Sequence, residues 1–525
     1  MNRIPAIDLF AGPGGLGEGF SSAGFDVRLS IEMDPYAHST LELRSMIRFL
    51  RNAGQSGRVT DILSTSEAEK GIRDLFHQST GSNSTHAWRA TLGETAHMDV
   101  ANRIDHALDN SEDWILLGGP PCQAYSLAGR SRMRTTRSDF DSDHRHFLYR
   151  EYLRIVADLA PPLFLMENVK GLLSAKVAGM PMFEQILLDL ERPRESIDCH
   201  PRRLVFADLE YELRPIVLPE SMRFDGPYGP KDFIVCAEKH GIPQARHRVL
   251  VLGVRKPAPE IGWLNSIARR AVPVRHAIDD LPRLLVGVSR RSTLSRSEVF
   301  ALIPEQNWLA ELRRRDPEVA LRIIEVAAFK TRNQRSPSKS YRSRRIRQTS
   351  NDLFTWLLQN QPRNPLNHEA RSHIPEDIHR YLFCACHAEA HGKAPKLEDF
   401  PLDLLPHHKN IKRDGAKSIF ADRFRVQTWD SPSTTVTSHI SKDGHYYIHP
   451  DPFQCRSLSV REAARLQTFP DDYLFCGPRT EQYKQVGNAV PPYLAFQIAK
   501  LLKPAFEKSS LHKKFRHADS AVLDL

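Results

Sequence analysis

Short apolar runs bounded by turn residues recur along the first half of the chain and predict buried strands. The first run, residues 4–10 (IPAIDLF), is followed by a glycine loop and by a helical stretch that ends at Gly24. Further runs of this kind are VRLSIEMD, WILLGGPP, PLFLMENV and RVLVLGV, separated by helical stretches such as 144–160. This alternation predicts an α/β fold with a mostly parallel sheet. In such a sheet we expect reactive residues where the strands end.

Two stretches interrupt this alternation. Residues 44–112 are more polar and partly helical, and we expect them to be an insertion outside the sheet. From about residue 282 helical, arginine-rich and loop-like segments take over, which predicts a second domain at 282–433 set into the first. The sheet pattern returns as TTVTSHIS and is followed by the helix PPYLAFQIAKLLK. Residues 434–505 therefore belong with the first domain, 1–281, and residues 506–525 form a tail.

Composition narrows the class of protein. The chain is 41% hydrophobic and 26% charged, as expected for a globular protein with a sizeable core. No apolar run approaches the roughly 20 residues that span a bilayer, and a strand pattern begins at once, so we expect a cytoplasmic protein without a signal peptide. Seven scattered cysteines predict reduced thiols. The net charge of +10 suits a polyanionic partner but specifies no sequence.

The glycine loop after the first strand suits a nucleotide-type ligand. The segment DLFAGPGGLGEGF places Gly12, Gly14, Gly15 and Gly17 between a strand and a helix, where backbone amides can approach a ligand at the helix N-terminus. Glu32 ends the next strand, and its carboxylate can accept hydrogen bonds from both hydroxyl groups of a ribose. A plain tight turn is the alternative. The loop alone does not distinguish NAD from S-adenosylmethionine.

Cys122 is the candidate nucleophile. The segment GGPPCQAYS places it directly after a buried strand, behind two glycines and two prolines that stiffen the loop. A cysteine in an arbitrary loop is as often a small packing residue, but this setting favours a catalytic thiolate. Cys384, Cys386, His387 and His391 resemble half a metal site without a second pair of ligands, so we expect no metal.

Three further residues are candidates for polar catalysis. The apolar strand PLFLMENV ends in Glu167, whose carboxylate emerges from a dry wall and could hold a proton. Glu-Asn pairs also cap helices. In QARHRVLVLGV the alternation places Arg246 and Arg248 on one face, where their guanidinium groups can bind a phosphate or a base carbonyl oxygen. Arginines at the start of a surface strand are otherwise unremarkable.

Together these segments resemble, in order, the signature of the DNA (cytosine-5) methyltransferase family of bacterial modification enzymes. The resemblance rests on FAGPGG, PPCQ, ENV and Q-x-R-x-R, and on RSLSVREAARLQTFPDDY and QVGNAVPP near the C-terminus. It covers residues 4 to about 40, 113–255 and 434–500. It implies a Rossmann-like S-adenosylmethionine-dependent methyltransferase sheet with an inserted target-recognition domain. An Asp that the family usually has near its third strand is displaced here, with Asp61 and Asp99 as candidates.

The resemblance assigns roles to individual residues. It implies that Cys122 attacks carbon 6 of a flipped-out cytosine, that Glu167 acts on ring nitrogen 3, and that Arg248 holds the exocyclic oxygen, with Arg246 fixing the loop. S-adenosylmethionine would donate the methyl group. The residues implied to bind it are Phe10, Ala11, Gly12, Gly14, Leu16, Glu32, Met33, Pro120, Asn488, Ala489 and Val490.

The resemblance also implies double-stranded DNA as the partner of a monomeric enzyme, beside a restriction or phage-defence nuclease. Residues 330–347 hold eight Lys or Arg and no acid, which suits a phosphate-contacting arm or else a solvated linker. Three other interpretations compete. An RNA methyltransferase fits less well because a region of about 150 residues, 282–433, is set between the fourth and fifth motifs. An oxidoreductase leaves PPCQ, ENV and QARHR unexplained, and a non-catalytic DNA-binding module leaves the four candidate catalytic residues unexplained.

Overall fold

The computed structural model describes most of the chain. The described residues are 3–81, 85–121, 148–177, 180–199, 201–202, 208–217, 228–265, 271–332, 352–406 and 423–522. The predicted nucleophile Cys122 and most of the basic segment 330–347 lie outside them.

A single mixed sheet organises the first part of the molecule. Its eight strands follow the order β3-β2-β1-β4-β5-β11-β8, and β9 also pairs with β11. The strands from β3 to β5 are parallel, whereas β11 runs antiparallel to β5, β8 and β9. The bounds are β1 Pro5–Leu9, β2 Asp26–Glu32, β3 Ala87–Arg89, β4 Ile115–Gly118, β5 Leu163–Val169, β8 Tyr211–Arg214, β9 Ile234–Cys236 and β11 His247–Arg255. The predicted α/β class is confirmed.

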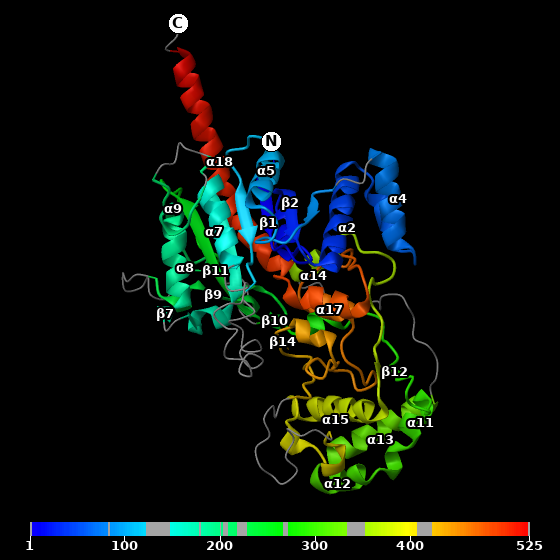
Figure 1. The fold of residues 1–525 in the computed structure, drawn as a ribbon. Helices are drawn as coiled ribbons and strands as arrows, with labels where there is room; N and C mark the ends of the chain where they lie inside the picture. Colours follow the sequence, from blue (N-terminus) through cyan, green and yellow to red (C-terminus); the bar gives the residue numbers. More distant parts are fainter. Residues whose placement is uncertain are drawn as a thin grey trace.

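Helices cover both faces of this sheet, which explains why its strands are nearly continuous apolar runs. In β1, Ile7 packs on one face with α5 His97–Leu108, α7 Leu148–Leu159 and α8 Met182–Glu191. Ala6 packs on the opposite face with α1 Gly15–Ser22 and α18 Pro492–Val522. Figure 1 shows α18, in red, running beside the sheet although it closes the chain. The C-terminal helix therefore completes the core that the N-terminal strand begins.

The region 44–112 is more closely joined to the sheet than we expected. The helices α2 Pro35–Asn52, α3 Ser56–Leu63 and α4 Ala68–Thr80 build a small core of their own. The strand β3, however, pairs in parallel with β2 and forms one edge of the main sheet. The expectation that this region lies outside the sheet is therefore wrong at β3, whose three residues are too few to give an apolar pattern.

A second hydrophobic core forms away from the sheet, at the lower end of the view in Figure 1. It is built mainly from α11 Arg296–Ala301, α12 Asn307–Arg315, α13 Pro317–Arg332 and α15 Pro375–His391. Beside it β12 Gly287–Val288 pairs with β13 Ser372–His373. The helix α14 Asp352–Leu358 instead packs against the core of the sheet domain. Shorter elements are α9 Pro193–Ser196, β6 Lys176–Val177 and β7 Met180–Pro181.

A third core joins these two parts and contains the last two family motifs. It includes α10 Val274–Ile278, α16 Val460–Leu466 and α17 Arg479–Asn488. The segment TTVTSHIS, expected to return to the main sheet, instead contributes β14 Ser433–Thr434 and a 3-10 turn at Ser438–Ser441. The strand β14 pairs with β10 Gln244–Ala245 in a separate two-stranded sheet. That pairing brings residue 434 beside the predicted catalytic arginines.

Buried ion pairs fix the position of α16. The guanidinium of Arg465 lies 2.6 Å from a carboxylate oxygen of Asp280 and 2.6 Å from one of Asp471, and all three side chains are buried. Arg456 pairs in the same way with Glu462 at 2.6 Å. Removing one partner from such a group leaves a buried charge without compensation. These pairs therefore link the segment around residue 280 to the last motifs.

We expect Arg465→Gln to lower the free energy of unfolding by about 3–5 kcal/mol, because it leaves two carboxylates buried without their cation. The control is Arg363→Gln, which breaks an exposed pair with Asp61 and should cost about 1 kcal/mol or less. Denaturant titration measures both. Equal losses in the two variants would contradict the role assigned to Arg465.

A buried acid in β1 generates a pH dependence. Burial raises the pKa of Asp8 from 3.8 to about 7, against the opposing effects of the Gly17 backbone and Arg48. Because the folded-state pKa is the higher one, the protein loses stability as the pH rises from about 4 to 7. Asp8→Asn should remove this loss, roughly 1.4 kcal/mol per pH unit within that window. Unfolding of both proteins at pH 5 and pH 8 measures it, and an unchanged difference between them would contradict it.

Candidate functional site

The glycine loop leaves β1 through a tight succession of left-handed residues. Phe10, Gly12 and Gly14 have φ angles of 53°, 56° and 88°, and α1 begins at Gly15. The amide of Gly12 donates a hydrogen bond to the Glu32 carboxylate at 2.8 Å. The loop thus lies directly against the end of β2, as the sequence predicted for a ligand held between the two strands.

Glu32 is a half-buried carboxylate at the C-terminal end of β2. Its second oxygen accepts a hydrogen bond from the amide of Asp34 at 2.8 Å. Burial raises its pKa, and the hydrogen bonds from backbone amides oppose that change. Each oxygen keeps a lone pair that could accept a hydrogen bond from a hydroxyl group. Met33, the next residue, is 56% exposed and offers an apolar surface beside this carboxylate.

The segment 486–490, which ends α17 and follows it, lies on top of the glycine loop. A Cβ atom added at Gly15 would lie 2.2 Å from the carbonyl oxygen of Val490, so only glycine permits this approach. The hydroxyl of Tyr473 donates to the carbonyl of Pro13. The side-chain amide of Gln467 donates to the carbonyl groups of Val486 and Ala489. The chain's last motif is thereby held against its first.

Arg246 also binds the segment 486–490, which we call the closing segment. Its side chain is only 1% exposed, and its guanidinium donates to the main-chain carbonyl groups of Val436, Gly487 and Ala489 at 2.7–3.3 Å. A guanidinium surrounded by main-chain oxygens cannot reach a base or a phosphate in this conformation. The expectation from strand alternation that Arg246 and Arg248 both bind a phosphate or a base therefore fails for Arg246. The role of fixing the loop, which the resemblance implied for Arg246, agrees with these hydrogen bonds.

The ends of β4 and β5 bring the predicted acid next to the predicted nucleophile loop. These strands are parallel neighbours, with Gly118 opposite Met166. The Asn168 side chain donates to the carbonyl of Pro120 at 3.2 Å. A Cβ added at Gly119 would lie 3.1 Å from a carboxylate oxygen of Glu167. Glu167 therefore faces the loop that leads to residue 122.

Glu167 forms an ion pair with Arg248 across β5 and β11. The Nε of Arg248 lies 2.8 Å from Oε1 of Glu167, and each side chain is 13% exposed. Burial lowers the pKa of Arg248, and the Glu167 carboxylate opposes that change. A charge-assisted pair of this kind fixes the orientation of both groups. Unlike Arg246, this pair keeps some surface that a ligand could contact.

The structure thus brings most of the predicted site residues to one edge of the sheet. Leu16 differs, because its side chain is buried in the hydrophobic core and leaves only its backbone for a ligand. Sequence reasoning gave no role to Gln467 and Tyr473, which hold the loops together. The signal was present, since both lie within the quoted segment RSLSVREAARLQTFPDDY.

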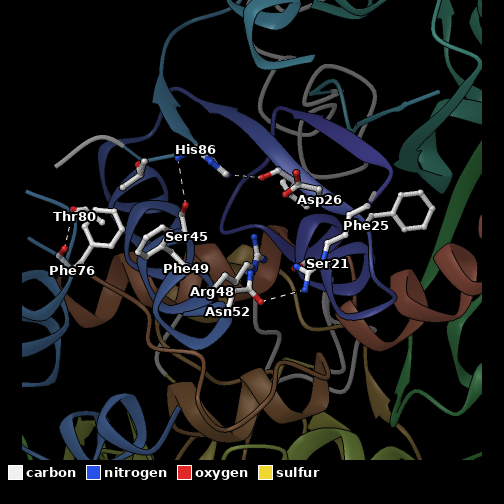
Figure 2. A pocket seen from close by; sticks show the side chains of 13 residues that line it. Ser21, Phe25, Asp26, Ser45, Arg48, Phe49, Asn52, Phe76, Thr80 and His86 are labelled. Atoms are coloured by element: carbon white, nitrogen blue, oxygen red, sulfur yellow. Dashed lines mark hydrogen bonds between the residues drawn. The ribbon is translucent and has the colours of Figure 1, made fainter. Parts of the chain in front are cut away.

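Other candidate features lie away from this edge. Cys384 and Cys386 are buried within the second core, and the groups of possible metal ligands found among the described residues do not include them. A cavity of about 240 Å³ lies between the start of β2 and α2, lined by residues such as Val27, Arg48 and His86 (Figure 2). The length of β2, about 20 Å, separates it from Glu32. It is therefore distinct from the glycine-loop site.

The helices that the structure describes include none with the length and apolar character needed to cross a membrane.

Comparisons with known proteins agree with this geometry. The sequence model of the C-5 cytosine-specific DNA methylase family matches residues 4–62, 68–192 and 210–504. The chain is 31% identical to the type II methyltransferase M.Bpa9945I of Bacillus paralicheniformis, across 95% of this chain and 98% of that protein. It is 26% identical to the type II methyltransferase M.AgeI of Thalassovita gelatinovora, across 96% of this chain and 100% of that protein.

A solved structure shares the fold. It is described as a DNA modification methyltransferase encoded within a prophage of Escherichia coli, and it covers 96% of this chain and 100% of its own with a TM-score of 0.53. At 20% identity this likeness supports the fold alone. The family match, however, extends over most of the sequence, and it includes the segments that meet at the site. The chain therefore belongs to the C-5 cytosine-specific DNA methylase family and is a DNA (cytosine-5-)-methyltransferase.

Proposed function

We propose that this enzyme transfers a methyl group from S-adenosylmethionine to carbon 5 of a cytosine flipped out of a specific duplex DNA sequence, through a transient bond to Cys122. The observation that carries the proposal is the Glu167–Arg248 ion pair, held beside the loop that leads to Cys122. A methyl transfer to carbon 5 needs such a pair because the pyrimidine ring must first be activated.

The cofactor assignment rests on the glycine loop and its surroundings. Gly12 and Gly14 leave backbone amides open to a ligand, and Glu32 offers carboxylate oxygens for ribose hydroxyls. Met33 would contact the adenine, and Pro120 and residues 488–490 would line the remaining wall. When bound, S-adenosylmethionine supplies an electrophilic methyl group.

The protein's part in the reaction begins with the thiolate of Cys122. Sulfur forms a bond to carbon 6, the carbon 5–carbon 6 double bond opens, and the electron pair moves through the ring toward nitrogen 3. Glu167 donates or shares a proton at nitrogen 3, and Arg248 binds the exocyclic oxygen. Carbon 5 then becomes nucleophilic and would accept the methyl group, whose departure would leave the donor as a neutral thioether. A base, which the sequence does not identify, then removes the carbon 5 proton, the double bond reforms and sulfur leaves.

Arg246 acts as a positioning residue in this scheme. It orders the segment around residue 436 and the closing segment, which lies against the glycine loop. Arg248 lies two residues further along the chain and contacts Glu167. Arg246 therefore holds the loops in place, whereas Arg248 binds the substrate.

The relatives support a proposal for the cellular role. Two of them are type II methyltransferases, so we propose that this enzyme protects host DNA beside a restriction or defence nuclease, in the cytoplasm and as a monomer. Carbon 6 cannot be reached in stacked DNA, and extruding the base costs a few kcal/mol that DNA contacts must offset. The second core, built from α11, α12, α13 and α15, would provide the target-recognition domain.

Bisulfite sequencing of DNA from cells that express the chain should find methylcytosine in one short motif. Cys122→Ala should abolish this signal and retain binding to the motif, because it removes the nucleophile and leaves the DNA-binding surface intact. A duplex with 5-fluorocytosine at that site should form a stable adduct with the wild-type enzyme only. Methylation by Cys122→Ala at the wild-type rate would refute the covalent route.

Glu167→Gln should lower kcat by about 100- to 10,000-fold, because an amide of the same shape can neither donate nor take up the proton. Binding to the DNA motif should change little, since the carbonyl oxygen of the introduced amide can still accept a hydrogen bond from Arg248. Single-turnover methylation measures the rate, and thermal unfolding checks the fold. Wild-type turnover in a folded variant would remove Glu167 from the chemistry.

A further inference from the structure

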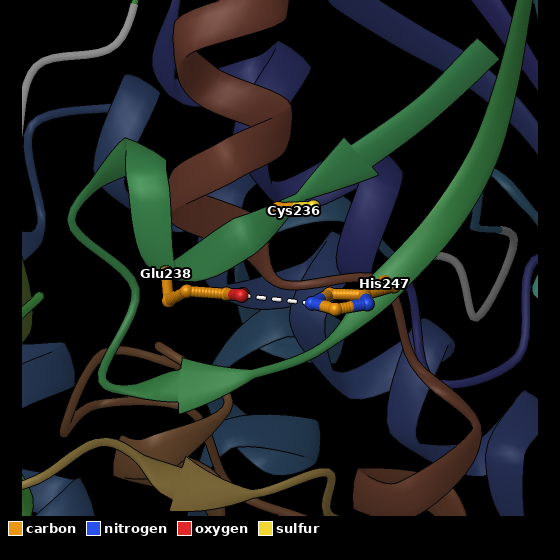
Figure 3. Close-up of side chains that lie close together, drawn as sticks. All are labelled: Cys236, Glu238 and His247. Atoms are coloured by element: carbon orange, nitrogen blue, oxygen red, sulfur yellow. Dashed lines mark hydrogen bonds and ion pairs between the residues drawn. The ribbon is translucent and has the colours of Figure 1, made fainter. Parts of the chain in front are cut away.

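The antiparallel pair β9 and β11 brings three possible metal ligands together. Cys236 and His247 are register partners at the end of β9 and the start of β11, and directly opposed residues project their side chains on the same face. Glu238 follows two residues after Cys236, in the 3-10 turn Ala237–His240 that leaves the strand. Figure 3 shows the carboxylate of Glu238 directed at the ring of His247, with Cys236 on the neighbouring strand.

The distances suit a small coordination sphere. One ligand atom from each residue lies within 4.8 Å of the other two, and Nε2 of His247 lies 2.7 Å from Oε1 of Glu238. Zinc binds nitrogen or oxygen at about 2.0–2.2 Å and sulfur at about 2.3 Å, which places tetrahedral ligand atoms roughly 3.3–3.8 Å apart. Side-chain rotations are therefore enough to place all three atoms around one ion.

A buried carboxylate oxygen without a partner also favours this site. The Oε2 atom of Glu238 is buried and has no hydrogen-bond partner among the described residues. A buried carboxylate oxygen without a partner is costly, and a cation would satisfy it. The His247 side chain is 37% exposed and that of Glu238 22%, which leaves an open side where water could be a fourth ligand.

The donor set selects the class of ion. A thiolate, an imidazole and a carboxylate suit zinc and similar transition metals, whereas magnesium and calcium prefer oxygen ligands only. The thiolate and carboxylate together neutralise a divalent charge. The ammonium groups of Lys170 and Lys239 also act on the Cys236 sulfur and would oppose a cation, and the two anionic ligands offset their charge.

We propose that Cys236, Glu238 and His247 form a binding site for one divalent transition-metal ion, with zinc as the best chemical match. The ion joins β9 to β11 and closes the segment 237–246, which carries Gln244 and the buried Arg246. The ion has a structural role: it holds β9 against β11 next to Arg248, and it takes no part in methyl transfer. The expectation of no metal was argued from Cys384 and Cys386 and did not consider these three residues, which the strand register brings together.

The test uses the full-length enzyme, stripped with a chelator and titrated with Zn²⁺ alone in a calorimeter. The wild type should bind about one equivalent, and Cys236→Ser, Glu238→Gln and His247→Gln should each weaken binding by more than about tenfold. Co²⁺ in place of Zn²⁺ should give a thiolate-to-metal charge-transfer band that Cys236→Ser removes. The matched control is Cys199→Ser, another partly exposed cysteine outside the cluster, which should bind as the wild type does.

Thermal unfolding without metal establishes that each variant is folded, and added Zn²⁺ should raise the melting temperature of the wild type and of Cys199→Ser only. Binding that survives in both Cys236→Ser and His247→Gln would place the ion elsewhere and overturn the proposal. Absence of stoichiometric binding to the wild type would overturn it equally. Neither outcome depends on methyltransferase activity, so the proposed function would be unaffected.

Discussion

The hydrogen bonds from Arg246 to three main-chain carbonyl groups are the contact on which the site depends. They join a residue next to β11 to segments that lie about 190 and 240 positions later in the chain. Each carbonyl group belongs to a segment without regular strand pairing to the main sheet, so the guanidinium supplies the partners that a sheet would otherwise provide. The glycine loop, the closing segment and the Glu167–Arg248 pair can then share one edge.

Buried charge has the same function around α16. Arg456 and Arg465 lie within the core, where Arg456 pairs with one carboxylate and Arg465 with two, each at 2.6 Å. Such pairs are often no more stabilising than apolar residues of similar size, but they tolerate few alternative arrangements. They therefore set the position of the third core relative to the sheet. Stability of the whole comes from the apolar cores, and the ion pairs specify how those cores meet.

Much of this arrangement could be predicted from the sequence, and the exceptions have physical reasons. Runs such as PLFLMENV predicted their strands because helices cover both faces of the sheet. The strand β3 was missed because three residues give no pattern, and TTVTSHIS resembled a longer strand because alternation does not reveal its pairing partner. Likewise, alternation could not tell that Arg246 is buried by later segments whereas Arg248 meets Glu167. The role of Cys122 remains a prediction because that residue lies outside the described residues.

The packing of Val490 onto Gly15 has a consequence for the order of events during synthesis. Chains emerge from the ribosome N-terminus first, and early domains generally fold before the rest is made. Here the first loop of the protein is completed by a segment about 475 residues later, and the helix that follows that segment fills the core beneath α1. A growing or truncated polypeptide therefore lacks the segment that packs on the glycine loop. This contact forms only when translation has almost ended.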